Sequence, residues 1–223
     1  IPMWQAFKQF VLRNPWIWIL CIANVFVYIV RIGIDNWAPL YVTEALGFDK
    51  LDAVNTIFYF EVGAILASMS WGYISDKLNG RRAAVAVACM VAIIFVVMLY
   101  RNATSVMMVN ISLFLLGALS FGPQLLIGIS LVGFVPKKGI SVANGMTGTF
   151  GYLFGDSVAK VGLAAIADPE RNGLTVFGHT LHGWSDVFIV FYVALFIGIA
   201  LLTLVAFGEE RRIRQVSKQL SQS

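Results

Sequence analysis

Six long apolar blocks constrain the fold of this chain more than any other feature of its sequence. A helix needs roughly 20 residues, at about 1.5 Å each, to cross the hydrocarbon core of a bilayer. The blocks that meet this length span residues 15–45, 52–75, 83–100, 105–135, 140–167 and 185–208. Because lipid cannot hydrogen-bond an exposed backbone, each block is predicted to be a helix. The expected fold class is therefore all-α, a polytopic membrane protein with six transmembrane helices.

The composition disfavours most functions of soluble proteins. Charged residues make up 13% of the chain, against about 25% in soluble domains. Cys21 and Cys89 both lie inside apolar blocks, which disfavours a disulfide framework or a zinc site. The sequence has no phosphate-binding glycine–lysine loop and no Ser/His/Asp arrangement on the spans. We therefore expect no enzyme activity, no cofactor and no metal.

The basic residues predict the orientation of the bundle. Eleven lysines and arginines fall on one side of the six blocks and three on the other, and the bias alternates loop by loop. Cytoplasmic loops carry the excess of positive charge, so both ends of the chain are expected in the cytoplasm. The same pattern assigns the net charge of +4 to membrane topology rather than to nucleic acid. The larger set is Lys8, Arg13, Lys77, Arg81, Arg82, Lys137, Lys138, Arg211, Arg212, Arg214 and Lys218, and the smaller set is Lys50, Arg101 and Arg171.

Three segments are expected along the chain. Residues 1–14 predict an amphipathic helix at the membrane surface, residues 15–208 the six-helix bundle, and residues 209–223 a basic cytoplasmic tail. The chain begins at Ile1 without an initiator methionine, so a further segment is expected upstream. The longest loop, residues 168–184, contains His179 and His182, which we interpret as ordinary surface histidines rather than as a metal site.

Five charged residues lie inside the spans, where each costs about 2.5–3.5 kcal/mol on insertion scales. They are Arg31, Asp35, Glu61, Asp156 and Lys160. Such residues usually pair with one another or line an aqueous path, so they mark the candidate site. Glu61 has no basic residue near it on its own helix, and it is expected to contact another helix or the cavity.

Arg31 has two interpretations. Asp35 follows it at i+4 on the same helix face, which favours a structural ion pair. Alternatively, Arg31 faces a cavity and binds an anion, because a guanidinium bonds phosphate bidentately and keeps its charge at depth. Asp156 and Lys160 are also spaced i, i+4 with the acid first, which predicts a neutral pair. Such a pair is compatible with a position on a substrate path.

Small residues form a second pattern in the spans. In the fifth block, glycines recur at spacings of three and four, which predicts a stripe for close helix approach. In the fourth block, Pro123 removes one backbone hydrogen bond and permits a bend. The glycines of the stripe are Gly145, Gly148, Gly151 and Gly155, followed by Gly162.

The loop between the second and third blocks carries an acid and a basic cluster after a glycine near the helix end. It resembles the cytoplasmic loop signature of the major facilitator superfamily, on residues Gly72, Asp76, Gly80, Arg81 and Arg82. In that superfamily the signature occurs in both six-helix halves of a carrier. The resemblance implies that this chain is one half of a major facilitator fold, helices 7–12, and that its partner is an N-terminal six-helix half.

Longer stretches resemble the bacterial organophosphate:phosphate antiporters of that superfamily. Residues 23–35 are similar to helix 7, residues 121–138 to helix 10 and the loop after it, and residues 152–160 to helix 11 of the hexose-phosphate type. The resemblance implies a transporter of the bacterial inner membrane that exchanges a sugar phosphate, hexose 6-phosphate, for inorganic phosphate by alternating access.

The resemblance also implies roles for individual residues. In that family one arginine from each half binds phosphate, and the arginine of this half corresponds to Arg31. Asp156 and Lys160 are further substrate-binding residues. The residues expected to line the cavity are Asp35, Glu61, Tyr28 and Tyr152.

Three alternatives remain open from the sequence. The first is a membrane sensor of sugar phosphate with the same fold, and the second is a proton-coupled carrier in which Glu61 or Asp35 titrates. The third is a channel, which is disfavoured because no filter sequence is visible.

Overall fold

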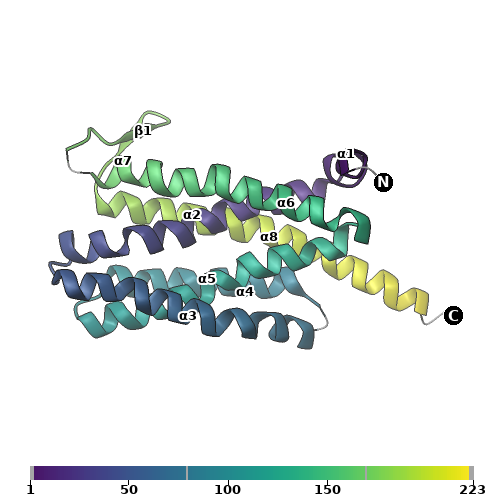
Figure 1. Cartoon of the computed structure of the whole chain (residues 1–223), viewed down its shortest axis with the longest axis horizontal. Coiled ribbons are helices and arrows are strands. Elements are labelled where there is room, and N and C mark those ends of the chain that lie inside the picture. The colour runs from purple at the N-terminus through teal and green to yellow at the C-terminus, as the bar shows by residue number, and fades with distance from the viewer. Residues whose placement is uncertain (1–2, 79, 169, 221–223) are drawn as a thin grey trace.

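The computed structural model describes residues 3–78, 80–168 and 170–220. Within these residues, six helices are long and apolar enough to cross a membrane, which confirms the predicted number. Figure 1 shows them side by side as one elongated bundle. In chain order they are α2 (Pro15–Glu44), α3 (Lys50–Lys77), α4 (Arg82–Arg101), α5 (Val106–Phe134), the composite helix Lys137–Ala167, and α8 (Trp184–Leu220).

The composite helix is less regular than its sequence predicts. A 3₁₀ turn (Lys137–Gly139) leads into α6 (Ile140–Phe150), and α7 (Leu163–Ala167) ends the span. Between α6 and α7 the chain forms two π-helical stretches, Gly151–Asp156 and Val158–Gly162. Such wide turns occur most often near functional sites, and here they hold the Asp156 and Lys160 side chains.

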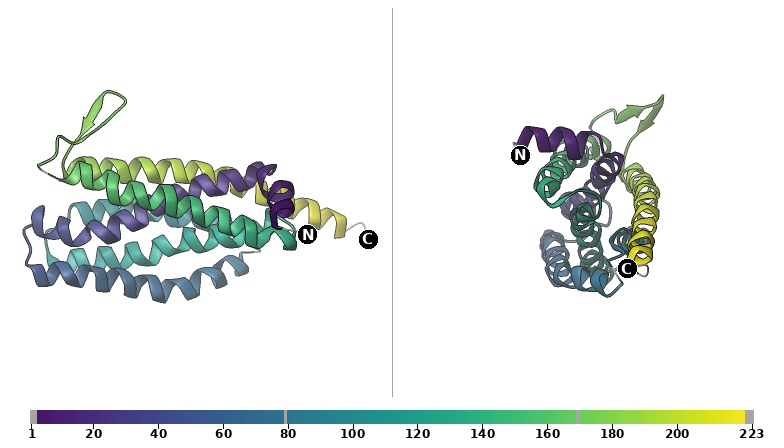
Figure 2. Two further views of the ribbon diagram at one scale, coloured as in Figure 1. Left: turned by 45° about the horizontal axis from the view of Figure 1, so that its top comes forward. Right: turned by 90° about the vertical axis from the view of Figure 1, so that its right-hand side faces the viewer.

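Both ends of the chain are helical as far as they are described. The short helix α1 (Met3–Ala6) and a π-helical stretch (Phe7–Leu12) lie across one end of the bundle (Figure 2). At the other terminus, α8 runs past the bundle at this same end (Figure 1), so the predicted tail continues as helix to Leu220. Residues 1–2 of the predicted surface helix and 221–223 of the tail lie outside the described residues.

The longest loop contains a small β-hairpin that the sequence reading did not predict. Strands β1 (Leu174–Val176) and β2 (His179–Leu181) pair antiparallel, with Val176 opposite His179. The two turn residues, Phe177 and Gly178, have φ of 50° and 82°. Positive φ at both central residues is the geometry that fits a two-residue hairpin turn.

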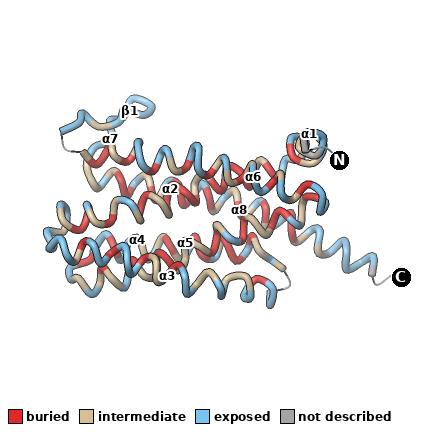
Figure 3. The backbone as a smooth tube through the Cα atoms, in the orientation of Figure 1, coloured by how far each residue is buried: buried red, intermediate tan, exposed pale blue. Residues whose placement is uncertain are grey.

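Buried apolar side chains fill the space between the helices, and apolar side chains also cover much of the outside. Figure 3 shows how buried and exposed positions alternate along the helices. The exterior residues include Met69, Phe95, Met107, Phe196 and Phe207, all more than half exposed. Helices α3 and α5 approach each other at two glycines, because a Cβ on Gly63 or Gly117 would overlap the backbone of the facing helix.

Candidate anion-binding site

Arg31 projects from the middle of α2 toward α5. Its Nη1 donates a hydrogen bond to Gln124 Oε1 at 2.8 Å. The guanidinium carbon lies 3.9 Å from the centroid of the Phe121 ring, within cation–π range. Its Nε is buried and has no hydrogen-bond partner. Arg31 is therefore held by an amide oxygen and an aromatic face, both of which are uncharged.

The structural ion pair between Arg31 and Asp35 is not formed. No described N···O distance joins these two side chains within the 4.0 Å limit of an ion pair, and Asp35 Oδ1 is buried without a hydrogen-bond partner. Asp35 still interacts electrostatically with both Arg31 and Glu61. The interpretation of a closed local pair was wrong because the guanidinium reaches a polar partner on another helix, Gln124.

A chain of side-chain contacts links Arg31 to the composite helix. Gln124 Nε2 donates to the hydroxyl of Tyr28 at 3.1 Å. The Tyr28 ring meets the edge of the Tyr152 ring, with centroids 5.1 Å apart and planes at 77°. Tyr28 is buried, whereas Tyr152 is largely exposed. The two tyrosines thus connect the half-buried arginine to the open face of the composite helix.

Sequence reasoning missed the role of Gln124. In the sequence, Gln124 stands out only as part of the stretch 121–138 that resembles a family helix. A usable signal was present, since an amide directly after Pro123 in an otherwise apolar span needs a hydrogen-bond partner at depth. Phe121 lies one turn earlier on the same helix, so α5 supplies both groups that hold Arg31.

Helix α2 is fixed against the composite helix on both sides of Arg31. Asn24 Nδ2 donates to the carbonyl of Thr147 at 2.9 Å, and Trp37 Nε1 donates to that of Ala159 at 2.8 Å. The predicted glycine stripe serves this contact only in part. Gly151 and Gly155 lie against α2, because a Cβ on either would crowd Tyr28, whereas Gly145 and Gly148 face open space.

Asp156 and Lys160 form the predicted pair, with Lys160 Nζ 3.0 Å from the carboxylate. The side chain of Lys160 is 54% exposed and that of Asp156 is 22% exposed. Among the described contacts, no hydrogen bond or ion pair joins this pair to Arg31. Glu61 is half-buried on α3 and makes no described hydrogen bond or ion pair of its own.

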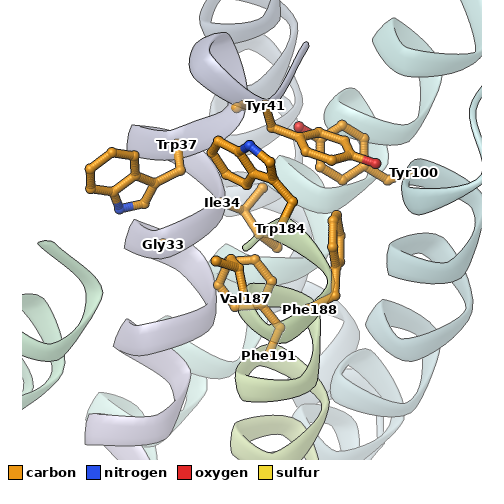
Figure 4. A pocket seen from close by; sticks show the side chains of 10 residues that line it. Gly33, Ile34, Trp37, Tyr41, Tyr100, Trp184, Val187, Phe188 and Phe191 are labelled. Carbon is orange, nitrogen blue, oxygen red and sulfur yellow. The ribbon is translucent and has the colours of Figure 1, made fainter. Parts of the chain in front are cut away.

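A small cavity lies at the opposite end of the bundle from the two termini. Aromatic side chains of α2, α4 and α8 converge around it, among them Tyr41, Tyr100, Trp184 and Phe188 (Figure 4). Its volume is about 10 Å³, room for about one water molecule. No charged side chain lines it, so it does not suit an anion.

The loop signature joins α4 to its neighbours. Gly80 has φ +72°, a backbone conformation that favours glycine. Arg81 donates from Nε and Nη2 to Glu210 at 2.9 and 3.3 Å, and Arg82 Nη1 donates to the carbonyl of Ile129 at 3.2 Å. Gly72 lies within α3, and Asp76 is exposed near its end. These contacts serve packing at the helix ends rather than the candidate site.

Comparison with known proteins places this geometry in context. The profile of the Major Facilitator Superfamily matches residues 3–158. The chain is 47% identical over 96% of its length to a hexose-6-phosphate:phosphate antiporter of Escherichia coli, covering 45% of that protein. It is 34% identical to a glycerol-3-phosphate transporter of Bacillus subtilis, over 88% of this chain and 42% of that one.

A third relative has a different described role. The membrane sensor protein UhpC of Escherichia coli is 35% identical over 91% of this chain, and the match covers 44% of the sensor. The chain thus spans about half the length of the curated relatives it matches. Six membrane-spanning helices, a family profile over more than half of the residues and these identities agree. The chain belongs to the major facilitator superfamily.

Proposed function

We propose that this chain forms the C-terminal six-helix half of a carrier that exchanges hexose 6-phosphate for inorganic phosphate by alternating access. The single observation that carries the proposal is the environment of Arg31. Its guanidinium is held by neutral groups and makes no ion pair, so its charge is available to a bound anion. The named activities of the antiporter and transporter relatives agree with a phosphate-bearing substrate.

The helices are buried to different extents, which supports an interface with a second half of the carrier. In the most apolar stretch of α2, 61% of the residues are buried, whereas the corresponding share is 17% in α3 and 33% in the composite helix. An open groove of about 610 Å³ runs along the composite helix beside Gly148, Tyr152 and Ser157. We assign this groove to the substrate path between this half and an N-terminal half, with Arg31, Asp156 and Lys160 as substrate-binding residues.

The proposed cycle uses only electrostatics and helix movement. Phosphate, or the phosphate group of the sugar, binds Arg31 together with an arginine of the other half. The two halves then rock around the bound anion, as in carriers built from repeated halves. Return of an empty site would leave two unpaired positive charges in low dielectric, which makes exchange favoured over one-way transport. The substrate is moved without covalent change, so the chain has no enzymatic role.

The distribution of charge supports an orientation for the bundle. The basic loops and the extension of α8 lie at one end of the bundle (Figure 1). We place this end in the cytoplasm of a bacterium, with the bundle in the inner membrane and both ends of the chain inside. The bilayer is then a second partner of this chain, beside the N-terminal half, and it contacts the exposed apolar side chains.

A proton-coupled carrier is the second candidate, and one observation favours it. Asp35 has a buried, unpartnered oxygen and interacts with a second acid, Glu61. Two acids at membrane depth are typical of proton relays. Asp35 lies one turn from Arg31 on α2, so this candidate uses the same region with a different driving ion.

The test is uptake of hexose 6-phosphate by the complete carrier in liposomes. Antiport predicts uptake only when the liposomes contain phosphate, with no loss when an uncoupler collapses the proton gradient. Uptake abolished by the uncoupler would favour proton coupling, and substrate binding without uptake would favour a sensor. Residues 1–223 alone are expected to show no phosphate-dependent exchange, because they supply one wall of the site; exchange by this chain alone would contradict the half-carrier proposal.

A further inference from the structure

A pocket of about 300 Å³ lies at the end of the bundle that holds both termini. Three segments form its walls: the start of α4, the last turn of α5, and the part of α8 beyond residue 208. Two arginines line it, Arg82 from α4 and Arg212 from α8. We call it the basic-end pocket, and it is separate from the Arg31 site.

The two guanidinium groups of this pocket are incompletely satisfied. Arg82 Nη1 donates to the carbonyl of Ile129, but its Nε is buried and has no hydrogen-bond partner. Arg212 makes no described hydrogen bond or ion pair, and its Nη1 lies beside Gly133, which has no side chain to exclude it. The neighbouring Arg81, by contrast, makes two hydrogen bonds to Glu210.

The N-terminus of α4 also favours a negative charge in the pocket. Arg82 is the first residue of α4, where the partial positive charge of a helix N-terminus makes a cation unfavourable. Glu209 is the one acid that lines the pocket, and it is 8% exposed. Its Oε2 already accepts a hydrogen bond from the Ala83 N–H at 2.9 Å. Two cations against one committed carboxylate leave the lining with a net positive charge.

The rest of the lining is apolar. Val132 and Phe134 come from α5, and Ile213 and Val216 from successive turns of α8. The pocket lies where α4 begins and α5 ends, which is the level at which membrane spans meet lipid headgroups. A fitting occupant therefore combines a phosphate with a hydrocarbon portion.

We propose that the basic-end pocket binds an anionic phospholipid, with its phosphodiester between Arg82 and Arg212 and its glycerol and acyl portion along the apolar wall. Basic pockets at helix ends on the cytoplasmic side suit anionic headgroups. The lipid offsets the excess positive charge of the pocket, and it ties the extension of α8 to α4 and α5. The proposal concerns lipid binding alone and holds whatever the carrier transports.

The test is lipid binding by the complete carrier in detergent, measured by native mass spectrometry with added phosphatidylglycerol, phosphatidylcholine or inorganic phosphate. Bound phosphatidylglycerol should exceed bound phosphatidylcholine and should fall about tenfold in Arg82→Gln/Arg212→Gln. In Arg212→Gln alone, the bound phosphatidylglycerol should fall several-fold. This variant should fold as the parent does, because the Arg212 side chain is exposed and makes no described hydrogen bond or ion pair. The matched control is Arg211→Gln, an exposed neighbour outside the pocket, which should bind as the parent does.

Three outcomes would overturn the proposal. Equal binding of the two lipids would remove the role of charge, and unchanged binding in Arg212→Gln would place the lipid elsewhere. Displacement of phosphatidylglycerol by inorganic phosphate at equal concentration would show that free phosphate, rather than a lipid, is the occupant. A carrier that fails to exchange phosphate would disprove the proposed function and leave this result unaffected.

Discussion

The two basic side chains near the proposed substrate path are held in opposite ways. Arg31 contacts an amide oxygen and an aromatic ring contributed by another helix. Lys160 contacts a carboxylate one turn away on its own helix, Asp156. A cation whose direct contacts are neutral retains an attractive field for an anion, whereas a cation in an ion pair is largely neutralised. The difference supports the proposal that Arg31 supplies the anion-binding charge and that the pair shapes the wall beside it.

The largest expected effect tests the arginine itself. Arg31→Lys keeps the charge but loses the planar fork, so it cannot make a bidentate contact with phosphate while it bonds Gln124. Phosphate-dependent uptake should fall by about two orders of magnitude, as expected for loss of a charge-assisted bidentate contact. The measurement is exchange in liposomes, corrected for membrane expression. Arg171→Lys in the exposed loop is the control, and normal uptake by Arg31→Lys would remove Arg31 from the site.

The next prediction tests an ion pair at Arg31 like the one that Lys160 makes with Asp156. Gln124→Glu places a carboxylate beside the guanidinium, at the position where the amide oxygen lies at 2.8 Å. The resulting ion pair should lower exchange about tenfold or more. Gln124→Leu removes the hydrogen bond without adding charge and should lower exchange only several-fold. Equal losses in the two variants would show that charge neutralisation at Arg31 is unimportant.

A third prediction concerns the neutral pair. Asp156→Asn or Lys160→Gln alone leaves one unpaired charge near the path, and each should reduce uptake about tenfold. The double variant restores neutrality and should recover part of that loss. Uptake of two sugar phosphates in both single variants and the double forms the cycle. Strictly additive losses would show that the two residues act independently.

The smallest effect is expected at Tyr28. Tyr28→Phe removes the hydroxyl that accepts from Gln124 Nε2 at 3.1 Å but leaves the ring contact with Tyr152. Loss of one neutral hydrogen bond should raise the phosphate concentration needed for half-maximal exchange by about fivefold at most, with little change in maximal rate. Kinetics of exchange at several phosphate concentrations measure both quantities. A fall in maximal rate alone would instead assign the hydroxyl to the rocking step.

Some features of the site were predictable because they are local. Asp156 and Lys160 meet because side chains four residues apart lie on one helix face, and the structure shows this contact. The same rule failed for Arg31 and Asp35, which have the same spacing. Local spacing shows which residues are able to pair, but a long side chain takes the best partner in three dimensions. For Arg31 that partner is 93 positions away in the sequence.

The sequence by itself determined the six spans, because the thickness of the bilayer sets the length and apolar character that a spanning helix needs. It also marked the five charged residues as exceptional through their cost in lipid. Only the tertiary structure decided which charges are neutralised, which glycines of the stripe contact α2, and that Arg82 and Arg212 share a pocket. These outcomes depend on contacts between helices far apart in the chain, and such contacts follow from packing of whole faces rather than from spacing along one helix.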